Sequence, residues 1–193
     1  MGRNMEAVAR HYIKHFRHRA ADELASFKSE RSFERAVRRA GAAETPEGRR
    51  YSHQRRRRQE ALIEAEVKLV RCIADLEGAV NFAKLHDVVN STVKNIDDIG
   101  DLYIYDTALR IGAKRDLKPT RVYLHSGTRE GAKALGLEWK RDCLDLFDFP
   151  ELRKQLEAHE IEDVLCIYKR YFKDEVYLED SEACWTDDDI DGC

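Results

Sequence analysis

The sequence predicts a mainly α-helical protein, folded as a compact helical bundle. Apolar residues recur at intervals of three and four in successive segments, which is the spacing of amphipathic helices. Charged residues make up 37% of the 193 residues, which favours exposed helical faces over a β-sandwich. The chain has only three prolines and ten glycines, so we expect no long disordered or collagen-like stretches.

Two helices are expected near the N-terminus, over residues 4–25 and 30–40. One face of the first collects Met5, Val8, Ala9, Tyr12, Phe16, Ala20 and Leu24. Gly41 is expected to end the second helix, because glycine readily adopts the left-handed conformation that follows a helix. A loop is expected over residues 41–52.

Helices continue through the middle of the chain. A long one is expected to follow Arg55–Arg58 and to end near Glu77, and leucines recur in it every seven residues at Leu62, Leu69 and Leu76. The next helix, over residues 80–94, is expected to bury Phe82, Leu85, Val89 and Val93. After a turn at Gly100, another is expected from about Leu102 to Gly112, with Asp101 as its N-cap and Ile104, Ala108 and Ile111 on its buried face.

The last third of the chain is less regular. Residues 122–124 fit a short strand or a helical turn, and periodicity does not separate the two. A short helix is expected after Ser126, ended by Gly136, and another after Pro150. A final apolar stripe consists of Ile161, Val164, Leu165, Tyr168 and Phe172.

Charge is sorted along the chain, and this suggests its domain organisation. Residues 1–60 contain 16 Lys and Arg against 8 Asp and Glu, whereas the rest contain 18 against 29. From Asp174 to Cys193 there are nine acidic residues and no basic one. We expect a basic helical arm over residues 1–54, a helical core domain over 55–172 and an acidic tail over 173–193.

The densest basic stretch is the main candidate binding site. Its members are Arg49, Arg50, Arg55, Arg56, Arg57 and Arg58. The planar guanidinium group binds phosphate oxygens through two parallel hydrogen bonds, and in a helix successive arginines would project on several sides. We therefore expect a non-enzymatic nucleic-acid-binding protein, for DNA rather than RNA, whose affinity falls with salt. An alternative is that the basic segment docks on an acidic protein surface, such as the protein's own tail.

Residues 82–112 resemble a helix-hairpin-helix DNA-binding motif. The resemblance rests on Ile96, on Ile99 with Gly100, and on the apolar helix that follows them. It implies that backbone N–H groups at the start of the second helix bind a DNA phosphate, largely without sequence preference. Asp98 stands where the family has its first glycine, and Asp97 and Asp101 lie beside it. Because three carboxylates repel a phosphate, we place the contacts on the arginines and keep Gly100 as a structural pivot.

Two other functions remain open. The protein could be an interaction subunit of a larger complex or a homodimer, with the Leu62–Leu69–Leu76 seam and the Ile161–Phe172 stripe facing a partner. It could also be a small enzyme with a polar site formed by Asp106, Arg110, His125 and Arg129. No phosphate-binding glycine loop, zinc-protease motif or hydrolase nucleophile motif occurs in the sequence.

Metal and cofactor sites are not expected. His11, His15, His18 and Asp22 share a helical face, but arginines lie nearby, so we expect a polar or nucleic-acid-facing surface there. The five cysteines are widely spaced without a Cys-x-x-Cys pair, which fits reduced thiols. No membrane-spanning run or secretory signal is seen, so we expect a cytoplasmic, intracellular protein without membrane contact.

Overall fold

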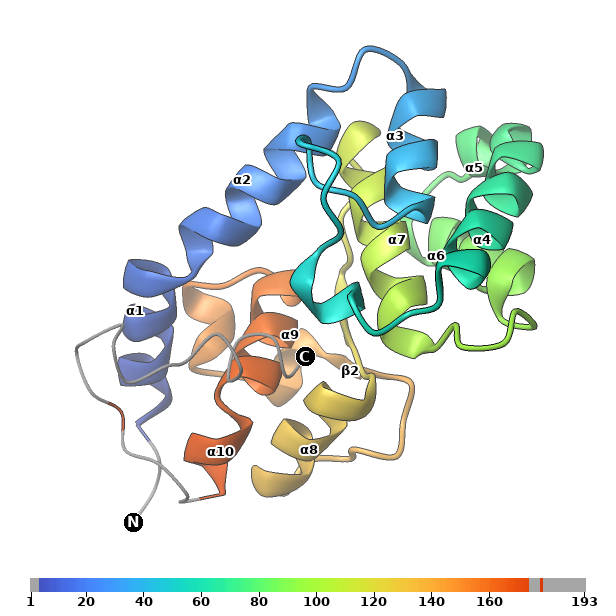
Figure 1. Cartoon of the computed structure of the whole chain (residues 1–193). Helices are drawn as coiled ribbons and strands as arrows, with labels where there is room; N and C mark the ends of the chain where they lie inside the picture. The colour runs from blue at the N-terminus through green and yellow to red at the C-terminus, as the bar shows by residue number, and fades with distance from the viewer. Residues whose placement is uncertain (1–3, 174–177, 179–193) are drawn as a thin grey trace. The chain divides into compact units, whose positions relative to one another are not determined.

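The computed structural model describes residues 4–173 and residue 178, and it confirms the mainly α fold (Figure 1). In this part of the chain there are ten α-helices, three short 3-10 helices and one two-stranded sheet. By its internal contacts the chain divides into two units. Unit 1 combines Met1–Ala20 with Thr120–Cys193, and unit 2 is Ala21–Pro119. The predicted arm, residues 1–54, therefore contributes to both units, and the predicted acidic tail lies almost entirely outside the described residues.

Unit 2 is helical throughout its regular structure. Its elements are the second part of α2 (Arg17–Lys28), then α3 (Phe33–Gly41), the 3-10 helix η1 (Ser52–Gln54), α4 (Gln59–Arg71), α5 (Ile73–Gly78), α6 (Phe82–Val93) and α7 (Asp101–Lys114). Helix α3 packs against α4 and α7, and α6 packs against the same two helices (Figure 1). The helices thus form a bundle around one apolar core.

The leucine seam belongs to this bundle. Leu62, Leu69 and Leu76 are at most 1% exposed, so the seven-residue repeat marks a core of the protein itself. The predicted long helix that ends near Glu77 is two helices, because the chain departs from helical geometry at Cys72 (φ −97°, ψ 19°). The first of them begins at Gln59, directly after the arginine run, with Arg58 as N-cap.

A close approach between α3 and α4 requires glycine at position 41. A Cβ atom added to Gly41 would lie 2.9 Å from the Cα atom of Glu66 on α4. Gly41 is the last residue of α3, so the helix ends where it was expected to end, but the left-handed residue after it is Ala43 (φ +53°) and not the glycine. The carbonyl oxygen of Gly41 accepts a hydrogen bond from the hydroxyl group of Tyr103 on α7 at 2.5 Å. One residue therefore ends α3 and lets three helices meet.

Helices α6 and α7 are joined by a tight turn. All the residues predicted to face the core from these helices are buried. The predicted N-cap of α7 is wrong by one residue: the N-cap is Gly100, and Asp101 lies in the first turn without a side-chain capping bond. Within the turn, Asp98 adopts a left-handed backbone conformation with φ +75°. Aspartate tolerates this conformation better than most residues with a side chain.

Unit 1 contains both strands. Its elements are α1 (Met5–His15), the start of α2, β1 (Arg121–Tyr123), α8 (Ser126–Ala134), β2 (Cys143–Asp145), η2 (Leu146–Asp148), η3 (Leu152–Lys154), α9 (Ala158–Ile167) and α10 (Lys169–Phe172). Strands β1 and β2 are antiparallel, with Val122 opposite Leu144. Of the two structures considered for residues 122–124, a strand and a helical turn, the first two residues form a strand. The predicted helix over residues 4–25 is interrupted at Phe16. After Pro150 the chain forms only the short η3 before α9.

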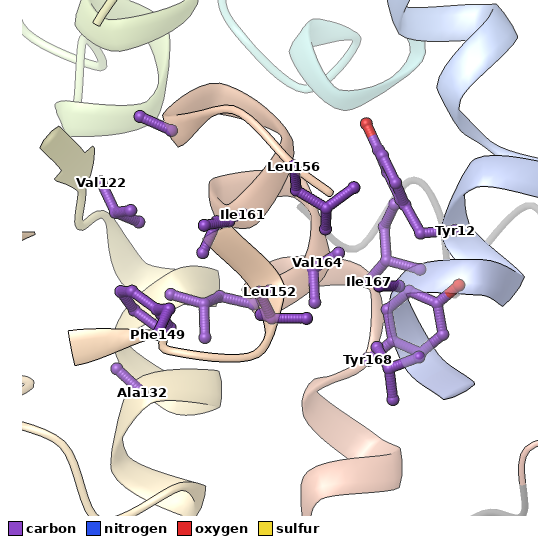
Figure 2. Close-up of a cluster of buried hydrophobic side chains, with 14 of the residues drawn as sticks. Tyr12, Val122, Ala132, Phe149, Leu152, Leu156, Ile161, Val164, Ile167 and Tyr168 are labelled. Carbon is purple, nitrogen blue, oxygen red and sulfur yellow. The ribbon is translucent and has the colours of Figure 1, made fainter. Parts of the chain in front are cut away.

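The core of unit 1 surrounds α9 (Figure 2). The predicted stripe from Ile161 to Phe172 is buried there, together with Tyr12 from α1 and Val122 from β1. Helix α8 packs directly on α9, because a Cβ atom at Gly131 would lie 2.1 Å from the carbonyl oxygen of Leu165. In the described part of the chain, no helix is long and apolar enough to cross a membrane.

Candidate nucleic-acid interface

The arginine segment, residues 49–58, is anchored along α7 at intervals of three residues. The guanidinium group of Arg110 lies over the ring of Tyr51, 4.0 Å from its centroid. Three residues later, Gln54 donates a hydrogen bond from Nε2 to Oδ2 of Asp106 at 3.0 Å. Arg110 and Asp106 are four residues apart on α7, so the segment follows one face of this helix. The segment is therefore held by side-chain contacts and does not extend freely from the fold.

The third anchor lies three residues further on, at the turn before α7. Arg57 donates from Nη1 to the carbonyl oxygen of Asp98 at 2.9 Å and to its Oδ1 at 3.0 Å. The backbone N–H of Arg58 donates to Oδ2 of Asp98 at 2.7 Å, and Nη2 of Arg58 donates to Oδ2 of Asp97 at 2.6 Å. The hydrogen bond from the Arg58 backbone, with help from the Arg57 side chain, lowers the pKa of Asp98. The carboxylates of this turn are thus neutralised by the second half of the arginine run.

Arg50 stabilises the segment from within. Its Nη1 donates to the carbonyl oxygen of Arg57 at 2.8 Å and more weakly to that of Arg55 at 3.4 Å, and its Nη2 contacts the side chain of Gln59. The backbone of Arg50 also forms a bridge with Glu44. Arg50 therefore closes the loop on itself and links it to the start of α4.

Four arginines of the segment are exposed, and three of them, Arg49, Arg55 and Arg56, do not share the contacts that Arg58 makes with Asp97 and Asp98. Within residues 4–173, none of these three guanidinium groups forms an ion pair. Because Arg55 and Arg56 lie between the anchors at Gln54 and Arg57, the backbone that carries them is fixed. The condition that the second half of the run is helical is not met, since α4 begins after Arg58. The six predicted residues thus separate into Arg50, Arg57 and Arg58, whose guanidinium groups contact other residues of unit 2, and Arg49, Arg55 and Arg56, whose guanidinium groups form no ion pair among the described residues.

A buried polar cluster supports the segment from below. Arg110 is 1% exposed, and its Nε donates to Oε1 of Glu23 at 2.7 Å, while Nη2 lies 3.9 Å from Oδ2 of Asp106. Burial alone would lower the pKa of Arg110, but Glu23 and Asp106 raise it above its ordinary value. Burial and the charge of Glu23 raise the pKa of Tyr51 to about 12. The guanidinium group therefore stays charged, and the carboxylates beside it compensate its charge.

The other two residues of the predicted enzymatic site lie in unit 1. His125 is the N-cap of α8, where its backbone N–H donates to Oγ1 of Thr128 at 2.7 Å, and its Nε2 contacts Oε1 of Glu162. Arg129 donates from Nη1 to the carbonyl oxygens of Trp139, at 3.0 Å, and Arg141, at 2.7 Å. Asp106 and Arg110 belong to unit 2, as described above. Each of the four thus makes local contacts that stabilise its own unit.

The histidine face of the first helix is not a surface. His11 and His15 are buried, with ring centroids 4.5 Å apart, and His11 Nδ1 lies 2.8 Å from the hydroxyl group of Tyr168. The expectation of a polar or nucleic-acid-facing surface is therefore wrong for these two residues, although His18 is exposed. Among the described residues, no cluster of three or more His, Cys, Asp or Glu is arranged to hold a metal ion.

The two stripes considered for a protein partner are both enclosed in the fold. The leucine seam is buried in unit 2, and the stripe from Ile161 to Phe172 is buried in unit 1. Exposed large apolar side chains do occur in unit 2, at Ile63, Val67 and Val80. A partner would have to use such residues, because the stripes are not accessible.

Sequence reasoning missed the role of Asp97 and Asp98 as partners of the arginine segment. Their negative charge is evident in the sequence, where it indicates only that the turn repels phosphate. The signal that could have identified the contact is opposite charge: a basic segment precedes the helices between residues 59 and 93, and an acidic segment follows them. Comparison of the chain with known protein families, curated proteins and solved structures found no match.

Proposed function

We propose that the protein binds nucleic acid without catalysis, through Arg49, Arg55 and Arg56 of the arginine segment. The observation that supports this most directly is the anchoring of the segment at Tyr51, Gln54 and Arg57. The anchors fix the backbone that carries Arg55 and Arg56, and among the described residues no carboxylate lies within ion-pair distance of Arg49, Arg55 or Arg56, although the charge of Arg49 helps to lower the pKa of Glu47. Binding a phosphate then costs little further ordering of the backbone.

The contacts proposed are with the phosphate backbone. Arginine binds phosphate oxygens through its planar fork, and such contacts position a protein without reading base sequence. Arg57 and Arg58 are neutralised by Asp98 and Asp97, so they contribute through the position of the segment and not through free charge. We therefore expect binding with little sequence preference.

The preference for DNA over RNA rests on the resemblance of residues 82–112 to a helix-hairpin-helix motif. Two helices joined by a tight turn are in keeping with this resemblance, and Asp98 has a positive φ where the family has a glycine. In our proposal the hairpin is a scaffold. Its turn binds the arginine segment, and the segment in turn contacts the phosphates.

A salt-dependent binding assay tests this proposal. The variant Arg49→Gln/Arg55→Gln/Arg56→Gln should bind a DNA duplex more weakly than the natural chain. The slope of log affinity against log salt should fall by about 2.7, since each phosphate contact on duplex DNA contributes about 0.9. The matched control is Arg10→Gln/Arg31→Gln/Arg71→Gln, which removes the same charge from exposed arginines outside the segment. Equal effects of the two variants would reduce the proposal to a general charge effect, and an unchanged affinity in both would refute it.

A further inference from the structure

Two lysine side chains approach the ring of a half-buried tryptophan of unit 1, Trp139. The Nζ atom of Lys133 is 5.3 Å from the centroid of the Trp139 ring, and that of Lys140 is 5.6 Å from it. These distances are within the range of cation–π attraction. Both lysines and the neighbouring Arg141 are exposed, and none of them pairs with a carboxylate in the described part of the chain. An aromatic ring surrounded by unpaired cations thus occurs on this surface.

The end of helix α8 brings these residues together. Gly136 has φ +74°, a conformation that glycine adopts without strain. Its N–H donates to the carbonyl oxygen of Lys133 at 3.0 Å, and the N–H of Leu137 donates to that of Ala132 at 2.9 Å. This pair of hydrogen bonds ends a helix and reverses the chain. Trp139 therefore returns to the last turn of α8, where Lys133 lies.

The loop that carries Trp139 is fixed from both sides. Arg129, one helical turn before Lys133, donates to the carbonyl oxygens of Trp139 and Arg141 and so holds the loop to α8. The tryptophan side chain also packs against the hydrophobic core of unit 1. Arg129 is thus a positioning residue. Because the ring is already ordered, little conformational entropy would be lost when a ligand stacks on it.

We propose that Trp139, Lys133 and Lys140 form a binding site for single-stranded nucleic acid, in which an unpaired base stacks on the indole ring. Stacking platforms of this kind combine an aromatic face with cations that follow the phosphate backbone. Lysine has a flexible four-carbon chain, so Lys133 and Lys140 can leave the ring and contact the phosphates on either side of the base. The site uses none of the residues of the arginine segment and is independent of the function proposed above.

The charge and polarity around the ring favour a polyanion over a lipid surface. Two carboxylates, Glu138 and Asp142, are exposed nearby. Oδ1 of Asp142 lies 3.5 Å from Nη2 of Arg129, which offsets its charge. The charge of Glu138 is then outnumbered by those of Lys133, Lys140 and Arg141. Binding to a lipid surface would need several exposed apolar side chains. In the described part of unit 1, Phe147 is the only large apolar side chain that is exposed. Aromatic stacking with phosphate contacts is therefore the better fit.

Tryptophan fluorescence of the full chain gives a direct test. The sequence has two tryptophans, Trp139 and Trp185, so Trp185→Phe leaves Trp139 as the only emitter. Oligothymidylate of about twelve nucleotides, within the usual site sizes, should quench this emission. An abasic oligonucleotide of equal length has the same phosphates without bases, and it should bind at least about fivefold more weakly. Oligouridylate in place of oligothymidylate then distinguishes RNA from DNA as the natural source of the base.

Two variants separate stacking from charge. Trp139→Leu keeps apolar bulk against the core but removes the emitter, so its binding is followed by the fluorescence anisotropy of labelled oligothymidylate. It should bind between about fivefold and about 100-fold more weakly than the natural chain in the same assay. Lys133→Gln/Lys140→Gln should reduce the salt slope by about 1.4, because each phosphate contact on a single strand contributes about 0.7. The control Arg71→Gln/Lys94→Gln removes two exposed charges from unit 2 and should not change the quenching.

Several outcomes would overturn the inference. They are the absence of quenching, equal binding of the abasic oligonucleotide, and a shift of Trp139 emission by anionic vesicles but not by oligonucleotides. If the triple arginine variant loses DNA binding while Trp139→Leu leaves oligothymidylate binding unchanged, the proposed function stands and this inference fails. If only Trp139→Leu weakens binding, the inference stands and the proposed role of the arginine segment fails.

Discussion

Arg57 and Asp98 are joined by two hydrogen bonds from a single guanidinium nitrogen, one to the backbone carbonyl oxygen and one to the carboxylate of Asp98. Asp98 also accepts the backbone N–H of Arg58, so one residue binds the arginine segment at three points. Its positive φ lets the carbonyl group and the side chain face the same segment. The turn before α7 therefore binds Arg57 and Arg58 of the arginine segment.

Replacing Asp98 by asparagine should loosen the arginine segment. Asparagine tolerates the left-handed backbone, so Asp98→Asn removes the charge without adding strain. Hydrogen bonds to a charged group typically contribute about 1.5–3 kcal/mol, and partial solvent exposure of this pair reduces the value, so we expect a loss of about 1 kcal/mol in unfolding free energy. Limited trypsin digestion should cleave the variant faster after Arg55, Arg56 and Arg57, because trypsin needs a locally flexible chain.

Asp97→Asn is the matched control for that experiment. Among the described residues Asp97 pairs only with Arg58, and its side chain is 92% exposed, so its ion pair is a surface contact. Such pairs contribute little to stability, and the change should stay below about 0.5 kcal/mol with no new trypsin cleavage. Equal digestion rates for the two variants would mean that the charge of the turn matters and the geometry of Asp98 does not.

The contribution of Asp98 to stability should depend on pH in one direction. Its pKa is lowered in the folded state by the Arg58 backbone N–H and the Arg57 side chain. The stabilisation is therefore fully present above the unfolded pKa, about 3.9, and it is lost as the pH falls through the folded pKa. The difference in unfolding free energy between the natural chain and Asp98→Asn should be constant at neutral pH and shrink below about pH 4. A difference that grows in acid would contradict the lowered pKa.

Removing the buried cation of unit 2 should be costly. In Arg110→Met, the carboxylates of Glu23 and Asp106 would lose a buried partner, and Tyr51 would lose the guanidinium group over its ring. Breaking a buried ion pair by deleting one partner typically costs about 3–5 kcal/mol, and because Glu23 is partly exposed we expect about 3 kcal/mol. Chemical denaturation measures the loss. The compensated variant Glu23→Gln/Arg110→Met should recover part of it, and no recovery would show that packing of Arg110 matters more than its charge.

The helical elements were largely predictable, because the spacing of apolar residues in an amphipathic helix indicates which face is buried. Leu62, Leu69 and Leu76, or Phe82 and Val89, are buried as the periodicity indicated. Breaks inside such helices were not predictable. Phe16 and Cys72 are compatible with a helix, and only packing in the folded protein determines that the chain bends there.

The candidate site was predictable in composition and not in geometry. The arginine run was evident, but which arginines are paired depends on contacts about 40 residues away in sequence, such as that of Arg58 with Asp98. Spacing within a segment carries no information about such pairs. The same limit explains the histidines. The spacing of His11 and His15 indicates a surface, but both are buried, and His11 contacts Tyr168 from the other end of the chain.

The contact between α8 and α9 should tolerate no side chain at Gly131. A Cβ atom there would lie 2.1 Å from the carbonyl oxygen of Leu165 and 2.8 Å from its carbonyl carbon, and backbone atoms of α9 cannot move aside as a flexible side chain does. Gly131→Ala should therefore force the helices apart and cost about 1–3 kcal/mol, as overpacking of a core does. Gly78→Ala is the control, because no atom lies within 4 Å of the added Cβ and alanine favours helices. Thermal unfolding should show a lower midpoint for Gly131→Ala and an unchanged or slightly higher one for Gly78→Ala. Equal midpoints for the two would mean that α8 and α9 pack less closely than their backbones indicate.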